Sequence, residues 1–378
     1  TPQSTMRDIH DYCVQNNIYS LSQGMIEIAP PTKLSEIATD FLSKPEHEAI
    51  HTYRRRFGEE DYISAIHDIL TKQFKVNLAK ENILATSGVT GGIVSTMNFL
   101  KRQGKHRIGL VEPFYTYHVK QAALVWPKEN IFFVPGNEDL SVNLDTIRKS
   151  IVENKLDAIL LCNPGNPSGL VLPKQTIQEL LKLTAELNCF IIFDECYCDF
   201  VWTVDGLYSP IQEATIPSNV AIIRGFSKSL GLQSWRMGYL VASPENVIAI
   251  MAEHDPVYIS LSWLQHALAT YVREHFDDYM SHLAKVKDTM RTNWNTLSPV
   301  IERKMGWKAI QPEGSMYGCF KHSEATDLDA VLKGIEAGIG VAPGTIFYGG
   351  PITNSGFIRI HCGVSKTKAA AIAESLSQ

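Results

Sequence analysis

Hydrophobic residues form short continuous runs in the middle of the chain, and these runs alternate with stretches whose apolar residues recur every three or four positions. The continuous runs predict buried strands and the periodic stretches predict helices. The seven predicted strands cover residues 83–86, 107–111, 131–134, 158–162, 190–193, 220–223 and 239–242. The helices predicted between and after them cover residues 91–100, 117–124, 144–153, 174–187 and 245–252. Strands that are apolar on both faces are typical of covered sheets, so we expect an α/β fold with one large, mostly parallel seven-stranded sheet between helices.

The two ends of the chain have a different pattern. Residues 1–35 are irregular and contain two consecutive prolines. After residue 260 a single long helical pattern continues towards residue 297, and short strands and helices follow it. The sequence therefore predicts three parts: residues 1–35 as a lid segment that belongs to a small domain, 36–284 as the large domain and 285–378 as the smaller α+β domain.

Composition and charge exclude several classes of protein. With 378 residues, of which 44% are hydrophobic, the chain can bury a sizeable core. Its formal net charge of −5 argues against binding to nucleic acid or to a membrane surface, and no apolar run is long enough to span a membrane. Seven cysteines without framework spacing indicate reduced thiols and a cytoplasmic location. Cys196 and Cys198 do not have zinc-site spacing, so no metal is predicted.

Lys228 and Arg236 lie in one loop between the strands predicted at 220–223 and 239–242. A lysine amine can form an imine with an aldehyde, and a guanidinium can bind a phosphate through two hydrogen bonds. Pyridoxal 5′-phosphate carries both groups. Taken alone, a lysine and an arginine at this spacing are more often a surface pair beside a turn. Whether they form a cofactor site therefore depends on the residues of the other loops.

Two other loops offer groups that suit a flat, anionic cofactor. Gly88, Val89 and Thr90 open a predicted helix, where free backbone N–H groups and the helix dipole favour an anion. Tyr115 follows the strand predicted at 107–111, and its ring could stack on a planar ligand. Glycine-rich helix starts and buried aromatic rings are common without a ligand, so each signal is weak by itself.

Three further positions carry polar groups at or inside predicted strands. Asn166 lies in a double Asn-Pro loop that presents its amide rigidly. Asp194 follows a buried strand, where a carboxylate needs a cation such as a protonated pyridine nitrogen, and Tyr197 follows it closely. Arg359 lies inside an apolar strand, where a substrate carboxylate is a suitable partner. A helix cap at Asp194 and a buried ion pair at Arg359 are the structural alternatives.

Taken together and in this order, the motifs resemble those of the class I/II aminotransferase family, which are pyridoxal-phosphate enzymes of fold type I similar to aspartate aminotransferase. The resemblance implies that the catalytic residues are Lys228, Asp194 and Tyr115. Lys228 forms the imine with the cofactor and moves the proton of the substrate. Asp194 pairs with the pyridine nitrogen, Asn166 and Tyr197 contact the phenolic oxygen, and Tyr115 stacks on the ring.

The resemblance also implies how anionic groups are bound. The cofactor phosphate is expected to contact Gly88, Val89, Thr90 and Arg236. Arg359 is expected to bind the α-carboxylate of the substrate, together with Asn166 and the backbone near Gly24. Tyr53 resembles the tyrosine that reaches the phosphate of a neighbouring subunit, which implies a homodimer. His118 matches a histidine that lies behind the aspartate in some members.

Three positions depart from the family pattern. Gly225 stands where relatives have a serine or threonine that contacts the phosphate, and Ser227 or Ser229 could replace that contact. Ser234 stands where glycine is usual, and the arginine of a glycine-led motif is missing from residues 58–63. None of these departures removes a residue of the central chemistry, but together they indicate a divergent branch.

The choice of reaction depends on where the proton goes after Cα is deprotonated. Transamination, which converts an amino acid into a 2-oxo acid, is the majority outcome in the family. The alternative is a lyase or cyclase that resembles capreomycidine synthase and acts on a hydroxylated arginine. An acidic lid of Asp8, Asp11 and Glu27 would suit that cationic substrate, whereas the basic run at 54–56 could supply an arginine for a dicarboxylate. A regulatory module is disfavoured because residues 1–35 are too short and too acidic for a DNA-binding domain.

Overall fold

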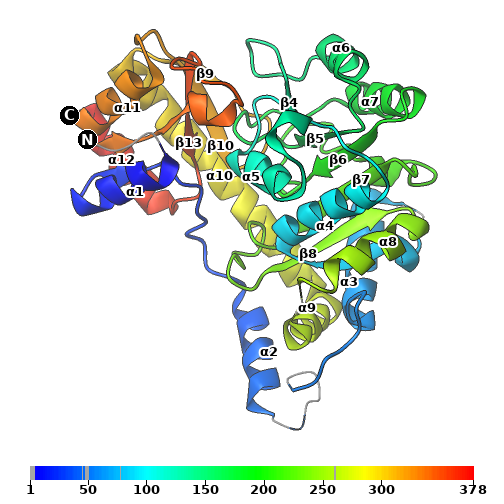
Figure 1. Cartoon of the computed structure of the whole chain (residues 1–378). Coiled ribbons are helices and arrows are strands. Elements are labelled where there is room, and N and C mark those ends of the chain that lie inside the picture. The colour runs from blue at the N-terminus through cyan, green and yellow to red at the C-terminus, as the bar shows by residue number, and fades with distance from the viewer. Residues whose placement is uncertain (1–4, 45, 47–50, 77, 259–260) are drawn as a thin grey trace.

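The computed structural model describes residues 5–44, 46, 51–76, 78–258 and 261–378. Its centre is a seven-stranded sheet with the order β2-β8-β7-β6-β5-β3-β4, and a four-stranded sheet with the order β12-β13-β10-β9 lies beside it (Figure 1). The predicted α/β class with one large, mostly parallel seven-stranded sheet is therefore confirmed. Residues 1–4 of the predicted lid segment, and the predicted change of pattern at residue 260, lie outside the described residues.

All seven predicted strands are present in the large sheet. They are β2 (Ile83–Ser87), β3 (Ile108–Val111), β4 (Ile131–Val134), β5 (Ala158–Cys162), β6 (Phe190–Asp194), β7 (Val220–Gly225) and β8 (Met237–Ala242). β8 is antiparallel to both of its neighbours, and the other pairs are parallel. The carboxyl ends of the parallel strands and the start of β8 consequently meet at one edge of the sheet.

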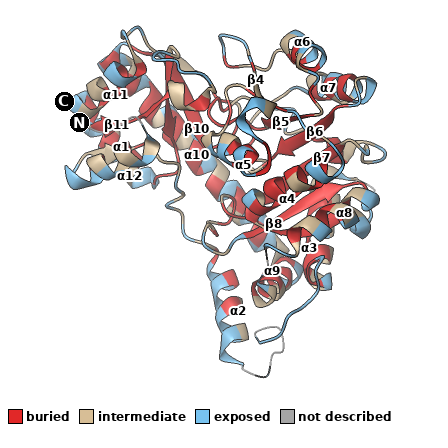
Figure 2. Cartoon of the chain, viewed as in Figure 1, coloured by how far each residue is buried: buried red, intermediate tan, exposed pale blue. Residues whose placement is uncertain are grey.

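Successive residues of each strand enter two different cores, which explains the continuous apolar runs. Ile222, for example, packs on one face of the sheet and Ile223 on the other. The first face is covered by α3 (Glu60–Phe74), α6 (Leu144–Asn154), α7 (Lys174–Glu186) and α9 (Ser262–Glu274). The second face is covered by α4 (Gly88–Arg102), α5 (Thr116–Val125) and α8 (Pro244–His254). Figure 2 shows the strands as buried between these helices.

The small sheet is built from the end of the chain and packs with its beginning. Its strands are β9 (Lys308–Ile310), β10 (Tyr317–Lys321), β12 (Ala342–Pro343) and β13 (Phe357–His361). It shares a core with α1 (Met6–Gln15), α10 (Phe276–Met305), α11 (Asp327–Glu336) and α12 (Lys366–Ser377). β1 (Tyr19–Ser20) pairs in parallel with β11 (Ile339–Gly340), so the N-terminal segment is fixed to the C-terminal part.

Two features differ from the sequence pattern or extend it. The single long helix expected after residue 260 is two helices, because the chain leaves helical geometry at His275 between α9 and α10. α2 (Thr32–Ser43) extends away from the sheets and packs against α9 (Figure 1). The domain boundaries stay a prediction, and the one near residue 285 falls within α10. No helix in the described ranges is both long and apolar enough to cross a membrane.

Candidate active site

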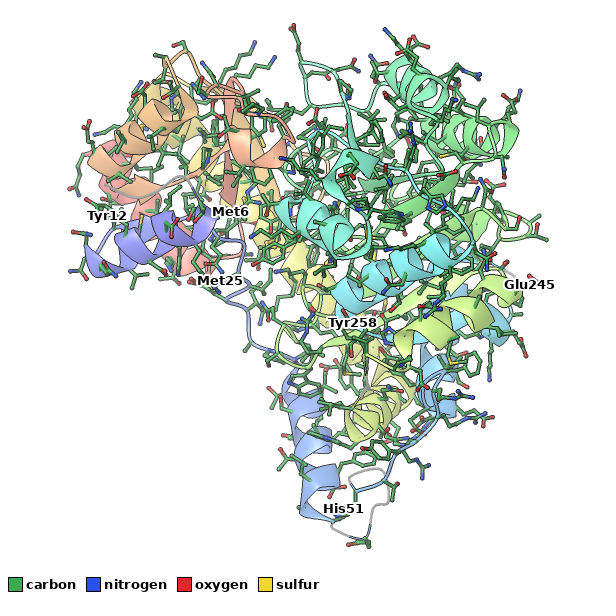
Figure 3. The ribbon with its side chains drawn as sticks, viewed as in Figure 1. Met6, Tyr12, Met25, His51, Glu245 and Tyr258 are labelled. Carbon is green, nitrogen blue, oxygen red and sulfur yellow. The ribbon has the colours of Figure 1, made fainter. Side chains whose placement is uncertain are left out.

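A cavity of about 740 Å³ opens at the edge of the large sheet where the strand ends meet, facing the small sheet. The N-terminal segment closes one side of it through Met6 and Met25, which Figure 3 labels. Ten of the predicted site residues line this cavity: Gly24, Val89, Thr90, Tyr115, Asn166, Asp194, Tyr197, Lys228, Arg236 and Arg359. Segments far apart in the sequence therefore supply one site.

The amine of Lys228 points to the N-terminal segment. Its Nζ donates a hydrogen bond to the carbonyl oxygen of Gly24 at 3.1 Å. Gly24 has no room for a side chain, because a Cβ there would lie 2.0 Å from the hydroxyl oxygen of Tyr317. Glycine thus permits a close approach that brings a backbone carbonyl to the lysine.

Asp194 ends β6 as a buried carboxylate with two protein contacts. Its Oδ2 lies 2.9 Å from Nε2 of His118, and its Oδ1 accepts a hydrogen bond from the N–H of Cys196 at 3.1 Å. The Nδ1 of His118 has no partner among the described residues, so the geometry assigns the donated proton to Nε2. His118, predicted to lie behind Asp194, is found there.

Asn166 connects the large sheet to the small one. Its Nδ2 donates to the Tyr197 hydroxyl at 3.4 Å, and its Oδ1 accepts from Nη1 of Arg359 at 2.8 Å. The Tyr197 hydroxyl in turn lies 3.3 Å from the hydroxyl of Tyr317, a cavity residue that the sequence pattern did not single out.

Arg359 is a buried cation that makes no ion pair with any described residue. Its guanidinium lies between two aromatic rings, 4.1 Å from the centroid of Tyr317 and 4.9 Å from that of Phe347. Its Nε has no hydrogen-bond partner among the described residues, although its exposed fraction is only 1%. Among the described residues, the structural ion pair considered for Arg359 is therefore absent. A buried guanidinium without an anion is costly, so an anion has a place to bind here.

The start of α4 and Arg236 form one concave surface. Gly88 has a φ of +66°, and a Cβ on it would lie 2.9 Å from Nη2 of Arg236. Gly88 is thus beside the guanidinium although it does not line the cavity itself. The N–H of Ser87 donates to Nε2 of His254 at 3.3 Å, and Nδ1 of His254 lies 2.8 Å from the hydroxyl of Ser95. His254 does not line the cavity, and it has no signal in the sequence because it reaches the start of α4 from the end of α8.

The structure distinguishes between Ser227 and Ser229 as replacements for the contact that is missing at Gly225. Ser227 lines the cavity, whereas Ser229 is buried outside it, so only Ser227 is placed to contact a ligand. A Cβ at Gly225 would lie 3.1 Å from Cγ2 of Val89, and a larger residue would press on the start of α4. Glycine at this position fits the packing of the strand end against the helix.

Other predicted residues lie away from the cavity. Tyr53 has an exposed fraction of 89% and does not line it, so its expected role in another subunit stays a prediction. Asp8 of the expected acidic lid lines the cavity, but Asp11 does not, and Glu27 pairs instead with Lys368 at 2.6 Å. The basic run at 54–56 is likewise outside the lining. Within the described ranges, no cluster of His, Cys, Asp and Glu could hold a metal ion.

The chain belongs to the aminotransferase class I and II family, whose family model matches residues 17–376. It is 24% identical over 353 residues to the aspartate aminotransferase of Thermotoga maritima, covering 92% of this chain and 88% of the relative. It is 26% identical over 246 residues to the histidinol-phosphate aminotransferase of Corynebacterium efficiens, covering 63% of this chain and 62% of that one. The resemblance inferred from the motifs is confirmed.

Solved structures share the fold over nearly the whole chain. The aspartate aminotransferase of Thermus thermophilus with maleate has a TM-score of 0.85 at 17% identity and covers 100% of this chain and 96% of its own. An Escherichia coli protein with a methionine aminotransferase function has a TM-score of 0.87 at 18% identity and covers 99% and 96%. The substrates named for these relatives differ, so the family does not fix the substrate of this chain.

Proposed function

We propose that this protein is a pyridoxal-phosphate-dependent aminotransferase that converts an α-amino acid into a 2-oxo acid. One observation carries the proposal. The Lys228 amine, the buried Asp194 carboxylate and the Arg359 guanidinium face the same cavity from three different segments. These are the groups needed for an aldehyde, a protonated ring nitrogen and a substrate carboxylate.

The residues present fit the cofactor. Lys228 would hold its aldehyde, and Asp194 would hold the ring nitrogen in its protonated form. The start of α4, with Val89 and Thr90, would bind the phosphate together with Arg236, since helix N–H groups and a guanidinium both favour an anion. Tyr115 would cover one face of the ring, and Asn166 with Tyr197 would donate hydrogen bonds to the phenolic oxygen. When bound, the cofactor supplies the electron sink that makes the substrate Cα–H acidic.

The protein side chains then bind, orient and transfer a proton. Arg359 holds the α-carboxylate of the substrate through paired hydrogen bonds, and the Asn166 carboxamide fixes the plane of the guanidinium. With the carboxylate fixed in this way, the Cα–H bond is oriented towards Nζ of Lys228. Nζ acts as the base that removes this proton and delivers it again. Burial of the site limits access of water during the transfer.

The contacts of the N-terminal segment favour transamination over the cyclase alternative. An enzyme for a hydroxylated arginine needs several carboxylates around the cationic side chain. Of the three considered, only Asp8 lines the cavity, and the basic residues Arg7 and Lys120 line it as well. Asp8 is therefore the one carboxylate of the expected acidic lid that lines the cavity, and it shares the lining with the cations Arg7 and Lys120.

The assembly and location of the enzyme are part of the proposal. A homodimer is supported by the exposed position of Tyr53, which leaves its hydroxyl available to the site of a second subunit. A cytoplasmic location is supported by the cysteine pattern, since all seven cysteines are free thiols.

Product analysis tests the proposed reaction. The purified protein is loaded with pyridoxal phosphate and incubated with single amino acids, including hydroxylated arginines, and the products are identified by mass spectrometry. A 2-oxo acid formed together with the pyridoxamine form of the cofactor is expected. Ammonia release or a ring-closed product without any 2-oxo acid would replace this proposal with the lyase or cyclase.

A further inference from the structure

Residues 344–355 form a long connection between β12 and β13, which are neighbours in the small sheet. We call these residues the strap. The strap begins with a short helix, η5 (Gly344–Phe347), and then crosses to the large sheet before it returns. Contacts at both ends of the strap, in its middle and on its cavity side join two parts of the proposed active site.

Both ends of the strap are held by one buried carboxylate, that of Asp327 at the start of α11. Its oxygens accept hydrogen bonds from the N–H of Thr345 at 2.6 Å, the N–H of Ser355 at 2.9 Å and the hydroxyl of Ser355 at 2.6 Å. Nε2 of His322 lies 3.0 Å from the same carboxylate. Four donors on a single side chain make Asp327 the anchor of the strap.

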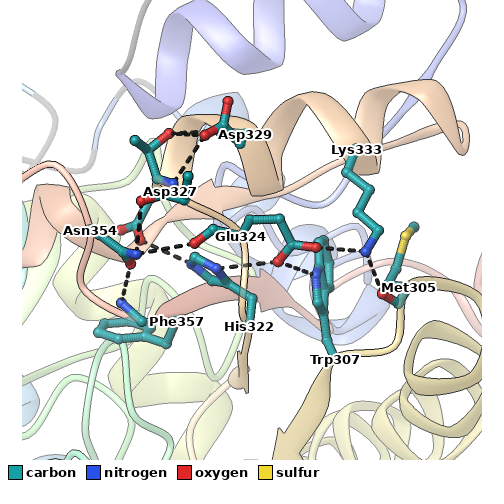
Figure 4. A network of polar contacts seen from close by, with 12 residues as sticks. Met305, Trp307, His322, Glu324, Asp327, Asp329, Lys333, Asn354 and Phe357 are labelled. Carbon is teal, nitrogen blue, oxygen red and sulfur yellow. Dashed lines mark hydrogen bonds and ion pairs between the residues drawn. The ribbon is translucent and has the colours of Figure 1, made fainter.

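Further polar contacts fix this anchor (Figure 4). Nδ1 of His322 lies 3.3 Å from Glu324 without a hydrogen bond, and Glu324 accepts hydrogen bonds from Nε1 of Trp307 at 3.0 Å and Nζ of Lys333 at 2.6 Å. Burial alone would raise the pKa of Asp327, but the donors from His322, Ser355 and Thr345 outweigh it and lower that pKa. The carboxylate is therefore anionic near neutral pH.

The middle of the strap contacts the loop that leads to Tyr115. The N–H of Phe114 donates to the carbonyl of Phe347 at 3.0 Å, and the N–H of Gly349 donates to Oε1 of Glu112 at 2.8 Å. Gly349 lies flat on Phe133 of β4, since a Cβ there would come within 2.1 Å of that ring. The strap is thus bonded to the residue immediately before Tyr115.

The cavity side of the strap contacts the proposed carboxylate site. The ring of Phe347 lies against the Arg359 guanidinium, with 4.9 Å between the guanidinium and the ring centroid, and Ile346 lines the cavity. Phe347 therefore touches Arg359 with its ring and holds Phe114 with its carbonyl. A single residue joins two positions that the proposed function assigns to substrate and cofactor.

We propose that the strap couples the substrate-carboxylate site at Arg359 to the ring-stacking site at Tyr115, with Asp327 as the positioning residue at its anchor. The strap keeps Phe347 in one place, so Arg359 and Tyr115 keep their mutual geometry as ligands bind. This inference rests on the proposed function for the identity of the two ligands. The coupling between the two segments can be measured without either ligand.

The first experiment compares Asp327→Asn with Asp329→Asn by hydrogen–deuterium exchange in the apo protein. Asp329 is the matched control, because it lies on the same helix but caps its start through Thr326, outside the strap. Asp327→Asn is expected to speed exchange by about tenfold or more, both in residues 344–349 and in residues 112–118. Asp329→Asn is expected to leave both at the wild-type rate. Faster exchange in 344–349 alone would overturn the coupling.

The second experiment measures the same variants as holoenzymes. Coupling predicts that Asp327→Asn raises both the KM for the amino acid and the Kd for pyridoxal phosphate by about tenfold, because small displacements of positioning groups are costly. A rise in KM with an unchanged Kd contradicts coupling, since only the Arg359 side would be disturbed. Failure of wild-type protein to bind pyridoxal phosphate would overturn the proposed function but leave the exchange result valid.

Removing a contact in the middle of the strap keeps the proposal testable if Asp327→Asn does not fold. Glu112 lies outside the cavity lining, and its carboxylate accepts the Gly349 N–H. Glu112→Ala removes this acceptor and is expected to raise the KM for the amino acid about tenfold, whereas Glu112→Gln keeps an acceptor oxygen and is expected to retain the wild-type value. A wild-type KM in Glu112→Ala would overturn the proposal.

Discussion

The side-chain oxygen of Asn166 accepts a hydrogen bond from Nη1 of Arg359 at 2.8 Å, and the other end of the same carboxamide donates to Tyr197. Asn166 follows β5 of the large sheet, while Arg359 lies in β13 of the small sheet. One amide thus fixes the relative position of a proposed cofactor contact and a proposed substrate contact. A rigid link of this kind suits a reaction in which both ligands must be aligned.

The contact between Asn166 and Arg359 predicts a specific effect of Arg359→Lys. Lysine keeps the charge but cannot form paired hydrogen bonds to a carboxylate or stack flat between Tyr317 and Phe347. We expect kcat/KM for the amino acid to fall about 100-fold, while the affinity for pyridoxal phosphate changes little. Steady-state kinetics measure the first and fluorescence titration of the apoenzyme the second. Arg291→Lys on the exposed side of α10 is the control, and equal kinetics in both variants would refute the role of Arg359.

Gly88→Ala tests the concave surface beside Arg236. The added Cβ would lie 2.9 Å from Nη2 of Arg236, and the residue has a φ of +66° that disfavours a side chain. Gly104 has a φ of +75° and no atom within 4 Å of the position that a Cβ would take, so Gly104→Ala carries the backbone strain alone. Both variants should lose about 1 kcal/mol of stability, but only Gly88→Ala should bind pyridoxal phosphate about tenfold more weakly. Equal affinities in the two variants would exclude a phosphate site at α4.

Asp194→Asn tests the partner of the ring nitrogen. The amide is close in shape to the carboxylate but has no charge to stabilise a protonated ring. We expect kcat to fall by about 10²- to 10³-fold, as for the loss of other preorganised charge partners. Circular dichroism serves as the check on folding, and Asp288→Asn on the exposed surface of α10 is the control. A kcat within a factor of two of wild type would rule out the assigned role.

The lowered pKa of the buried His254 side chain predicts that the stability of the protein depends on pH. Burial lowers its pKa to about 4, against a reference of 6.5. Between these pH values the unfolded chain binds a proton that the folded chain does not, so stability is full above pH 6.5 and decreases as pH falls towards 4. The free energy of unfolding should fall by about 1.4 kcal/mol per pH unit from this group.

Denaturant unfolding at pH 7 and pH 5 measures this dependence. His254→Gln removes the titrating group, so its loss of stability between the two pH values should be about 2 kcal/mol smaller than that of the wild type. His106→Gln, at an exposed position, is the comparison. An identical pH dependence in His254→Gln and wild type would show that His254 is not held neutral in the fold.

The sequence predicted the large sheet well, because buried parallel strands leave continuous apolar runs that turn residues interrupt. The residues at the strand ends could also be singled out from the sequence, because a polar residue such as Asp194 or Asn166 is unusual beside an apolar run. The break at His275 was not visible, because the apolar residues Tyr271, Phe276 and Tyr279 continue the helical spacing across it. The spacing of apolar residues shows which face of a helix is buried, but it does not show where the backbone leaves helical geometry.

Contacts made through the tertiary fold could not be predicted. His254, Tyr317 and the Asp327 anchor have no local motif, and they reach the start of α4, the cavity and the strap, respectively, from other elements. Glu27 was expected to face a substrate, yet it pairs with Lys368 near the opposite end of the chain. A charge in an irregular segment has many possible partners, and only the packing of the segment decides among them.

The most direct test of the central claim is to reduce the protein loaded with pyridoxal phosphate with borohydride and map the labelled peptide by mass spectrometry. Lys120 also lines the cavity and serves as an internal comparison for nonspecific reaction. We predict one stoichiometric pyridoxyl label on Lys228, which is lost in Lys228→Ala. A label on Lys120, or none on Lys228 in protein that retains the cofactor, would contradict the assignment of Lys228 as the residue that binds the cofactor aldehyde.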